Sequence, residues 1–149
     1  MSGLSSRILA VLALTTAFTV ASGKTLYAQP LDTLLANADV AAGEKISHRC
    51  AMCHTFDKGD ANKIGPNLWN IVGSFRAHVS GFNYSDALKS MNHEKWTYDA
   101  LNLFIANPHK FAPGDKMPFA GIANEKERAD LIAWMRTLSD NPAPLPAAK

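Results

Sequence analysis

The segment that most constrains how this chain folds is Cys50-Ala51-Met52-Cys53-His54. Two cysteines separated by two residues and followed by a histidine form the attachment signature of c-type haem. The two thiols add across the two vinyl groups of the porphyrin, one helical turn spans them, and the next residue is then directed at the iron. The motif predicts one covalent haem c, attached through Cys50 and Cys53, with His54 as an iron ligand.

The same cysteine pair has other possible uses. A disulfide forms readily in an oxidising compartment, and C-x-x-C also occurs in thiol redox enzymes. However, no βαβ pattern surrounds the pair, so the scaffold of a thioredoxin-like enzyme is missing. Structural zinc needs further ligands at metal spacing, and the chain has only 2 cysteines. Haem attachment is the interpretation that uses all three motif side chains.

The N-terminal residues 1–23 have the pattern of an export signal. Arg7 is followed by an uncharged, largely apolar stretch from Ile8 to Gly23, whose small last residues suit cleavage before Lys24. A second cleavage site follows Ala28. The stretch is slightly shorter than the ~20 apolar residues of a spanning helix. We therefore expect export, with this segment either removed as a signal peptide or kept as an uncleaved membrane anchor.

The rest of the chain divides simply. Residues 24–37 show no clear period and are predicted to be a spacer, residues 38–139 a single domain, and residues 140–149 an extended, unpacked Pro/Ala-rich tail. The formal net charge is +2. Since two basic residues, Arg7 and Lys24, precede Thr25, 13 basic and 13 acidic residues remain from Thr25 onward. This balance argues against nucleic-acid binding.

Several helices can be predicted within the domain. Leu131, Trp134, Met135 and Leu138 follow the spacing of one helix face, and Asn124 is a suitable N-cap for that helix. Further helices are expected at 97–106, ending before Pro108, around 42–49, and for a short turn from residue 85. The pattern predicts an all-α fold: one domain whose helices and long loops wrap around one covalent haem.

The sixth iron ligand determines what such a haem does, because a thioether closes the iron to exogenous ligands. Met52 lies inside the attachment motif, Met135 belongs to an apolar helix face, and Met91 has no rigid surroundings. Met117 follows Pro113-Gly114-Asp115-Lys116 and precedes Pro118, in a loop stiffened on both sides. Met117 is the predicted ligand.

Seven short segments in order carry a specific resemblance to a known family. They are the motif at 50–54, Gly-Pro-Asn-Leu at 65–68, Gly-Phe-Asn-Tyr-Ser-Asp-Ala at 81–87, Asn-Pro at 107–108, Pro-Gly-Asp-Lys-Met at 113–117, Phe-Ala-Gly-Ile at 119–122, and Glu-Arg-Ala-Asp-Leu-Ile-Ala at 127–133. Residues 38–139 resemble class I cytochrome c of the mitochondrial and alphaproteobacterial type. With its apolar N-terminus and spacer, the chain is similar to the membrane-anchored bacterial members.

The resemblance implies roles for further residues. It implies that Pro66 accepts a hydrogen bond from the ring of His54, and that Tyr84 and Trp96 bind a haem propionate. Gly43, Leu131 and Trp134 match a packing contact between the terminal helices. Lys116 would sit at the exposed haem edge, where Lys58, Lys63 and Lys110 could contribute to a docking face.

Departures from the family pattern are also visible. Ser74 stands where many relatives have a propionate-binding arginine, and Arg76, two residues later, is a possible substitute. Leu88 and Phe104 replace the Asn and Tyr of a polar network near the methionine ligand. Ser47 replaces an aromatic residue that packs on the last helix, which predicts a looser contact there.

The resemblance implies an electron-transfer protein, not an enzyme. Its expected partners are redox proteins of the respiratory chain, a quinol–cytochrome c oxidoreductase as donor and a terminal oxidase as acceptor, on the periplasmic side of the bacterial inner membrane. The alternative is a haem module with open iron, for gas binding or peroxidase-type activity. That alternative requires that Met117 leave the iron free.

Overall fold

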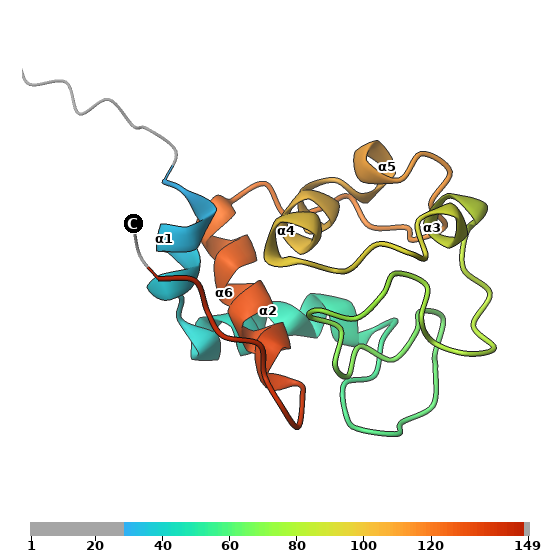
Figure 1. Cartoon of the computed structure of the whole chain (residues 1–149), viewed down its shortest axis with the longest axis horizontal. Helices are drawn as coiled ribbons and strands as arrows, with labels where there is room; N and C mark the ends of the chain where they lie inside the picture. Colours follow the sequence, from blue (N-terminus) through green and yellow to red (C-terminus); the bar gives the residue numbers. More distant parts are fainter. Residues whose placement is uncertain (1–28, 148–149) are drawn as a thin grey trace, which may run out of the picture.

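The computed structural model describes residues 29–147, and within this range the chain is helical (Figure 1). The helices are α1 (Leu31–Ala36), α2 (Val40–Ala51), α3 (Asp86–Ser90), α4 (Tyr98–Ala106), α5 (Pro108–Phe111) and α6 (Glu125–Thr137). The strand-type pairing found among the described residues is an isolated bridge between Phe75 and Lys95. The predicted all-α fold with long loops is confirmed.

Side-chain caps set the starts of the helices from α2 to α6, whereas α1 follows Pro30 without one. Asn124 accepts a hydrogen bond from the backbone N–H of Glu127, as the sequence predicts, and Thr97, at the start of the helix expected at 97–106, accepts one from Ala100. Ser85 caps α3 in the same way. Pro108 ends α4 but also begins the single turn of α5, where its missing N–H costs nothing.

Helix α6 is the centre of the core, and α1, α2 and α4 pack around it (Figure 1). Leu131 and Ile132 have no exposed surface. The crossing of α2 over α6 is close because Gly43 has no side chain: a Cβ atom there would lie 2.0 Å from the carbonyl oxygen of Asp130. Asp130 is itself buried and accepts hydrogen bonds from the backbone N–H of Asp39 and from Lys126.

The expected loosening at Ser47 is not seen. Ser47 is buried on α2, and its hydroxyl donates to the carbonyl oxygen of Glu44 at 2.6 Å. An aromatic contact on α6 comes instead from Phe56, in the loop after α2, whose ring packs edge-on against Trp134 with centroids 4.9 Å apart. The aromatic partner of Trp134 is thus supplied by the loop after α2 and not by α2 itself.

The segment predicted as a spacer contains a helix, so that part of the prediction is wrong. Helix α1 lies within residues 24–37 and packs against α6, and its Leu35 is completely buried. With six residues, α1 is too short to show a helical period. It is stabilised by this tertiary contact, which sequence periodicity cannot report.

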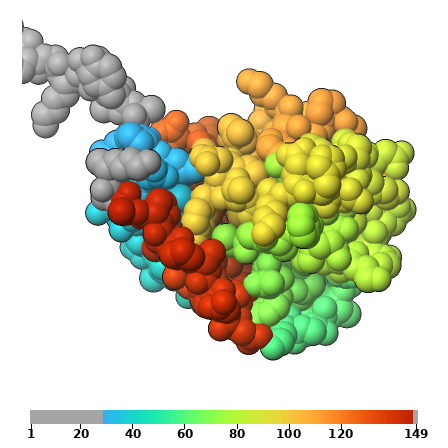
Figure 2. All heavy atoms as spheres, viewed as in Figure 1, coloured from blue at the N-terminus to red at the C-terminus, as the bar shows by residue number. Residues whose placement is uncertain are grey.

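The C-terminal tail is extended, as predicted, but it is not unpacked. The hydroxyl of Tyr98 donates to the carbonyl oxygens of Ala143 and Pro144, at 3.3 and 3.2 Å, and Arg136 also donates to Ala143. Figure 2 shows this segment, in dark red, lying across one face beside the regions of α1, in blue, and α4. The tail therefore joins the start of α4 to the end of α6.

The predicted export segment, residues 1–23, lies outside the described residues. None of the helices within 29–147 combines the length and the hydrophobicity that crossing a bilayer requires.

Candidate haem-binding site

A cavity of about 370 Å³ lies between the end of α2, the long loops, α4 and α6. Its walls are mainly apolar and include Leu68, Ile71, Leu88, Leu101, Ile105 and Leu131. These residues come from segments spread over the whole domain, so the cavity is built by the fold and not by one loop. A mainly apolar cavity with a few polar groups is typical of a cofactor site.

The attachment motif forms one wall of this cavity. Cys50 lies in the last turn of α2, and the backbone N–H groups of Cys53 and His54 both donate to its carbonyl oxygen, at 3.0 and 2.9 Å. All three side chains line the cavity. Burial raises the pKa of the Cys50 thiol. A thiol redox enzyme needs a lowered cysteine pKa, so this environment does not favour that alternative.

The ring of His54 is fixed from two sides. Its Nδ1–H donates to the carbonyl oxygen of Pro66 at 2.7 Å, because a carbonyl can only accept. Gly65 packs against the other side of the ring, where a Cβ atom would lie 2.4 Å from Cε1. Burial lowers the pKa of His54; the Pro66 contact opposes this and the charge of Lys63 adds to it. A neutral ring whose Nδ1 is occupied leaves Nε2 free for a metal.

Three of the methionines considered as iron ligands line the cavity, namely Met52, Met117 and Met135, while Met91 does not. Met52 is 77% exposed. Met135 lies on α6 and is buried in the core. The backbone N–H of Met117 donates to the carboxylate of Asp115 at 3.1 Å, and Pro118 follows it. Met117 thus combines a place at the cavity with a fixed backbone.

The two predicted propionate-binding residues, Tyr84 and Trp96, are buried and line the cavity. Burial raises the pKa of Tyr84, and a backbone hydrogen bond at Val79 opposes that shift. Trp96 is held through its backbone, whose N–H donates to the carbonyl of Ser74 at 2.8 Å and whose carbonyl accepts from Gly73 at 2.8 Å. Both residues are therefore available to a polar group at this end of the cavity.

Ser74 and Arg76 lie close to Trp96 but are not part of the cavity wall. The guanidinium of Arg76 is buried, stacks over the rings of Trp96 and Phe111 at 5.2 and 4.8 Å, and pairs with Glu94 at 2.7 Å. Its Nε is buried without a partner. Arg76 therefore supports Trp96 through this stack, although it is not itself one of the residues that line the cavity.

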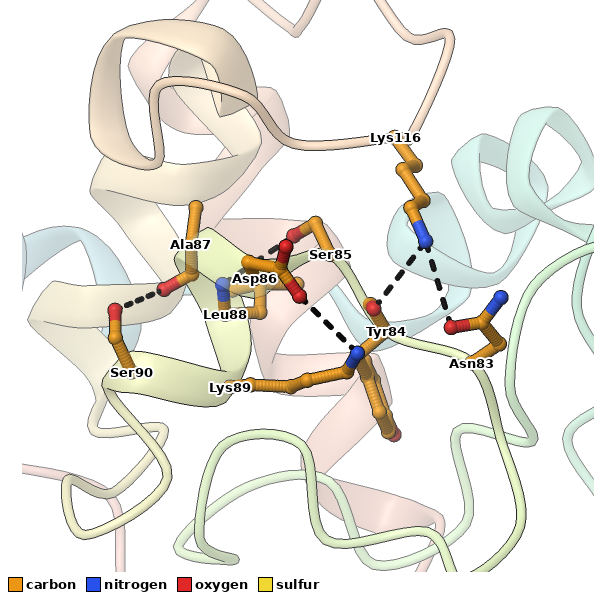
Figure 3. Close-up of polar contacts among 9 residues, drawn as sticks. All are labelled: Asn83, Tyr84, Ser85, Asp86, Ala87, Leu88, Lys89, Ser90 and Lys116. Carbon is orange, nitrogen blue, oxygen red and sulfur yellow. Dashed lines mark hydrogen bonds and ion pairs between the residues drawn. The ribbon is translucent and has the colours of Figure 1, made fainter.

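Lys116 faces the loop that precedes α3. Its amino group lies 3.4 Å from the carbonyl oxygen of Tyr84 and 3.5 Å from the side-chain oxygen of Asn83 (Figure 3). Of the other lysines, Lys63 donates to the carbonyl of Ala51 at 2.9 Å, and Lys58 pairs with Asp140. Lys116 thus links the loop of Met117 to the loop of Tyr84.

Leu88 and Phe104, the two apolar departures from the family pattern, both line the cavity. Phe104 packs against Trp96 with ring centroids 4.9 Å apart. The wall near Met117 therefore lacks the polar groups that an Asn and a Tyr would supply at these two positions.

The arrangement fits haem c. Cys50, Cys53 and His54 line the same cavity as the thioether of Met117, and the rest of the lining is mainly apolar and includes Tyr84 and Trp96. The sequence profile of the cytochrome c family matches residues 40–139. The chain belongs to the cytochrome c family. Members of this family bind haem c covalently, and Cys50 and Cys53 stand in the attachment position.

Several known cytochromes are similar. A "Cytochrome c homolog" of Bradyrhizobium diazoefficiens is 48% identical over 121 residues, 80% of this chain and 65% of that protein. One of Rickettsia bellii is 39% identical over 104 residues, 70% of this chain and 60% of that protein. The solved structure of cytochrome cH from Methylobacterium extorquens has 40% identity and a TM-score of 0.62, covering 67% of this chain and 99% of its own. The chain thus spans less than two thirds of the length of both curated relatives.

Sequence reasoning overlooked Gly65 as a site residue. The contact of Pro66 with His54 is predicted, but Gly65 enters only as part of the family segment 65–68, and both residues contact the His54 ring. Gly65 was detectable in principle, because a glycine next to a residue that binds the ligand ring often marks a close approach.

Proposed function

We propose that this cytochrome c is a carrier of single electrons whose haem iron is ligated by His54 and Met117. Electron carriage by a haem protein is the function of the family. The observation that carries the finer proposal is that His54 and Met117 line the same mainly apolar cavity, with the ring of His54 and the backbone of Met117 each held by a hydrogen bond. With both ligands in place the protein has no open site for substrate, so we propose that it is not an enzyme.

The protein's own groups set the properties of this carrier. When bound, haem c supplies an iron that gains or loses one electron. The carbonyl of Pro66 holds the His54 ring in one tautomer and increases its basicity as a ligand. Asp115 and Pro118 restrict the backbone of Met117. The apolar wall excludes water, which keeps the surroundings nearly unchanged between the two oxidation states.

The partners and location follow from the same proposal. We propose that the chain accepts electrons from a quinol–cytochrome c oxidoreductase and passes them to a terminal oxidase, on the periplasmic side of a bacterial inner membrane. Residues 1–23 would be either removed after export or retained as an anchor. Docking should be weak and fast, as small redox interfaces allow. The intact mass of protein from a native membrane fraction tests whether the segment is removed.

The first test is an absorption spectrum of the haem-loaded protein, oxidised and then reduced. Low-spin c-type bands in the reduced state, with the weak red band of ferric thioether ligation, are the expected result. A high-spin spectrum that shifts on adding carbon monoxide would contradict the proposal, and would favour the open-iron alternative of gas binding or peroxidase-type activity.

The second test assigns the sulfur ligand. Met117→Ala should abolish the red band and normal electron transfer while the haem stays attached through Cys50 and Cys53. Met135→Leu is the matched control, because Met135 also lines the cavity and leucine conserves its volume. It should keep the red band. If Met135→Leu loses the band and Met117→Ala keeps it, the ligand assignment is wrong.

A further inference from the structure

An arginine of α2 rests on the loop that carries Met117. The guanidinium carbon of Arg49 lies 5.6 Å from the centroid of the Phe119 ring, within the range of a cation–π contact. Arg49 directly precedes Cys50, and Phe119 comes two residues after Met117. Both side chains line the cavity. The contact therefore joins the helix that ends in the attachment motif to the loop with the second candidate ligand.

Phe119 and Met117 are mechanically coupled. The backbone N–H of Phe119 donates to the carbonyl oxygen of Met117 at 2.8 Å, which closes a tight turn around Pro118. Proline fixes its own φ, so this turn has little freedom to change shape. On the other side, Asp115 accepts from the N–H of Met117. A force that holds the Phe119 ring in place therefore also holds the backbone of Met117.

Other contacts hold the loop of Met117 to segments other than α2. Lys116 reaches the loop of Tyr84, at the long distances of 3.4 and 3.5 Å (Figure 3). The loop ends where the N–H of Ile122 donates to the carbonyl of Ile105 on α4, at 2.9 Å. Neither contact reaches α2. Among residues 29–147, the stack of Arg49 on Phe119 is thus a side-chain contact that holds the loop toward Cys50, Cys53 and His54.

We propose that Arg49 is a positioning residue for Met117: by stacking on Phe119, it holds the loop of residues 113–121 against α2 and opposes opening of the iron on the Met117 side. This inference rests on the proposed ligation by Met117. Arg49 is exposed, so the strength of the contact is that of a surface cation–π pair, which corresponds to a change of about two- to fivefold in the opening equilibrium.

The test uses imidazole as a competitor of Met117 in the ferric, haem-loaded, full-length protein. Its binding requires the loop to open, so its affinity and its limiting rate at high concentration report opening. Arg49→Gln should increase both by about two- to fivefold. The matched control is Lys45→Gln, which removes one positive charge from an exposed residue of the same helix, one turn earlier. It should bind imidazole like the wild type.

A double-mutant cycle separates stacking from charge. Phe119→Leu removes the ring but keeps an apolar side chain, and in that background Arg49→Gln should have no further effect. If Arg49→Gln and Lys45→Gln behave alike, or if Arg49→Gln acts equally with and without the Phe119 ring, the inference is wrong while Met117 ligation stands. If the wild type lacks the red ferric thioether band, both fail together.

Discussion

The crossing of α2 over α6 and the wall of the haem cavity are held together in different ways. At the crossing, protein meets protein: the backbone at Gly43 touches that of Asp130, whose buried carboxylate accepts from Asp39 and Lys126. Along the wall, apolar side chains from loops and helices face a space of about 370 Å³. The crossing is complete without a cofactor, whereas the wall is complete only when the haem of this family fills it.

Removing the haem should have the largest effect and should act mainly on the wall. At ~24 cal/mol per Å³, an empty space of about 370 Å³ costs roughly 9 kcal/mol, comparable with the whole stability of a typical domain. We expect the Cys50→Ala, Cys53→Ala double variant, purified without haem, to lose hydrogen-exchange protection in residues 55–85 and 112–121. Residual protection should persist in α2 and α6. Equal loss in both regions would contradict the distinction.

Gly43→Ala should act on the crossing of α2 over α6 and not on the wall of the haem cavity. The new Cβ would lie 2.0 Å from the carbonyl oxygen of Asp130 and 2.9 Å from the Cβ of Trp134, so the helices must separate. We expect a loss of about 3 kcal/mol in the free energy of unfolding, measured by urea denaturation of the haem-loaded protein. The haem spectrum should change little. Glu44→Ala, on the exposed face of the same helix, should stay within ~0.5 kcal/mol of the wild type.

Gly65→Ala should produce the reverse combination, a moderate loss of stability with a changed haem spectrum. Its Cβ would meet the His54 ring at 2.4 Å and push the ring away from the carbonyl of Pro66. We expect a loss of about 1–3 kcal/mol, with shifted low-spin bands and a changed reduction potential. Gly59→Ala is the control: its φ of +84° makes alanine unfavourable, but no atom lies within 4 Å. It should lose stability without changing the spectrum.

The starts of α4 and α6 were more predictable from the sequence than α1 or the docking of the C-terminal tail. Thr97 and Asn124 are local cap signals, and they mark the starts of α4 and α6 correctly. The apolar face of α6 is a local signal as well, because it is visible in the spacing of residues along one segment. Helix α1 has no such signal, since six residues hold too few apolar positions to define a period. The docking of the tail depends on carbonyl oxygens of Ala143 and Pro144, which every residue possesses. Residue types therefore do not predict such contacts.

At the haem-binding site, the chemical type of a residue identified more of the candidate residues than its spacing in the sequence did. Cysteine, histidine and methionine are rare and reactive, so Cys50, Cys53, His54 and Met117 could be selected as candidates from their types and neighbours. The place of Arg76 could not be predicted from its spacing to Ser74. It depends on the short backbone pairing of residues 73–76 with 94–96 and on the stack of Trp96 and Phe111, which the fold creates. These long-range contacts direct the guanidinium onto the rings of Trp96 and Phe111.

We predict the smallest effect for the loop that contains His78. Burial lowers the pKa of His78 below its ordinary 6.5, while a backbone hydrogen bond at Phe75 partly opposes the shift. The folded state thus favours the neutral ring, so its contribution to stability is present above the unfolded pKa and is lost as the pH falls through the lowered folded pKa.

His78→Gln removes this titration. Between pH 7 and pH 5 the wild type should therefore lose slightly more stability in urea denaturation than the variant does. The effect is small because the ring is only partly buried; parallel pH profiles for the two proteins would show that the loop does not restrain the ring.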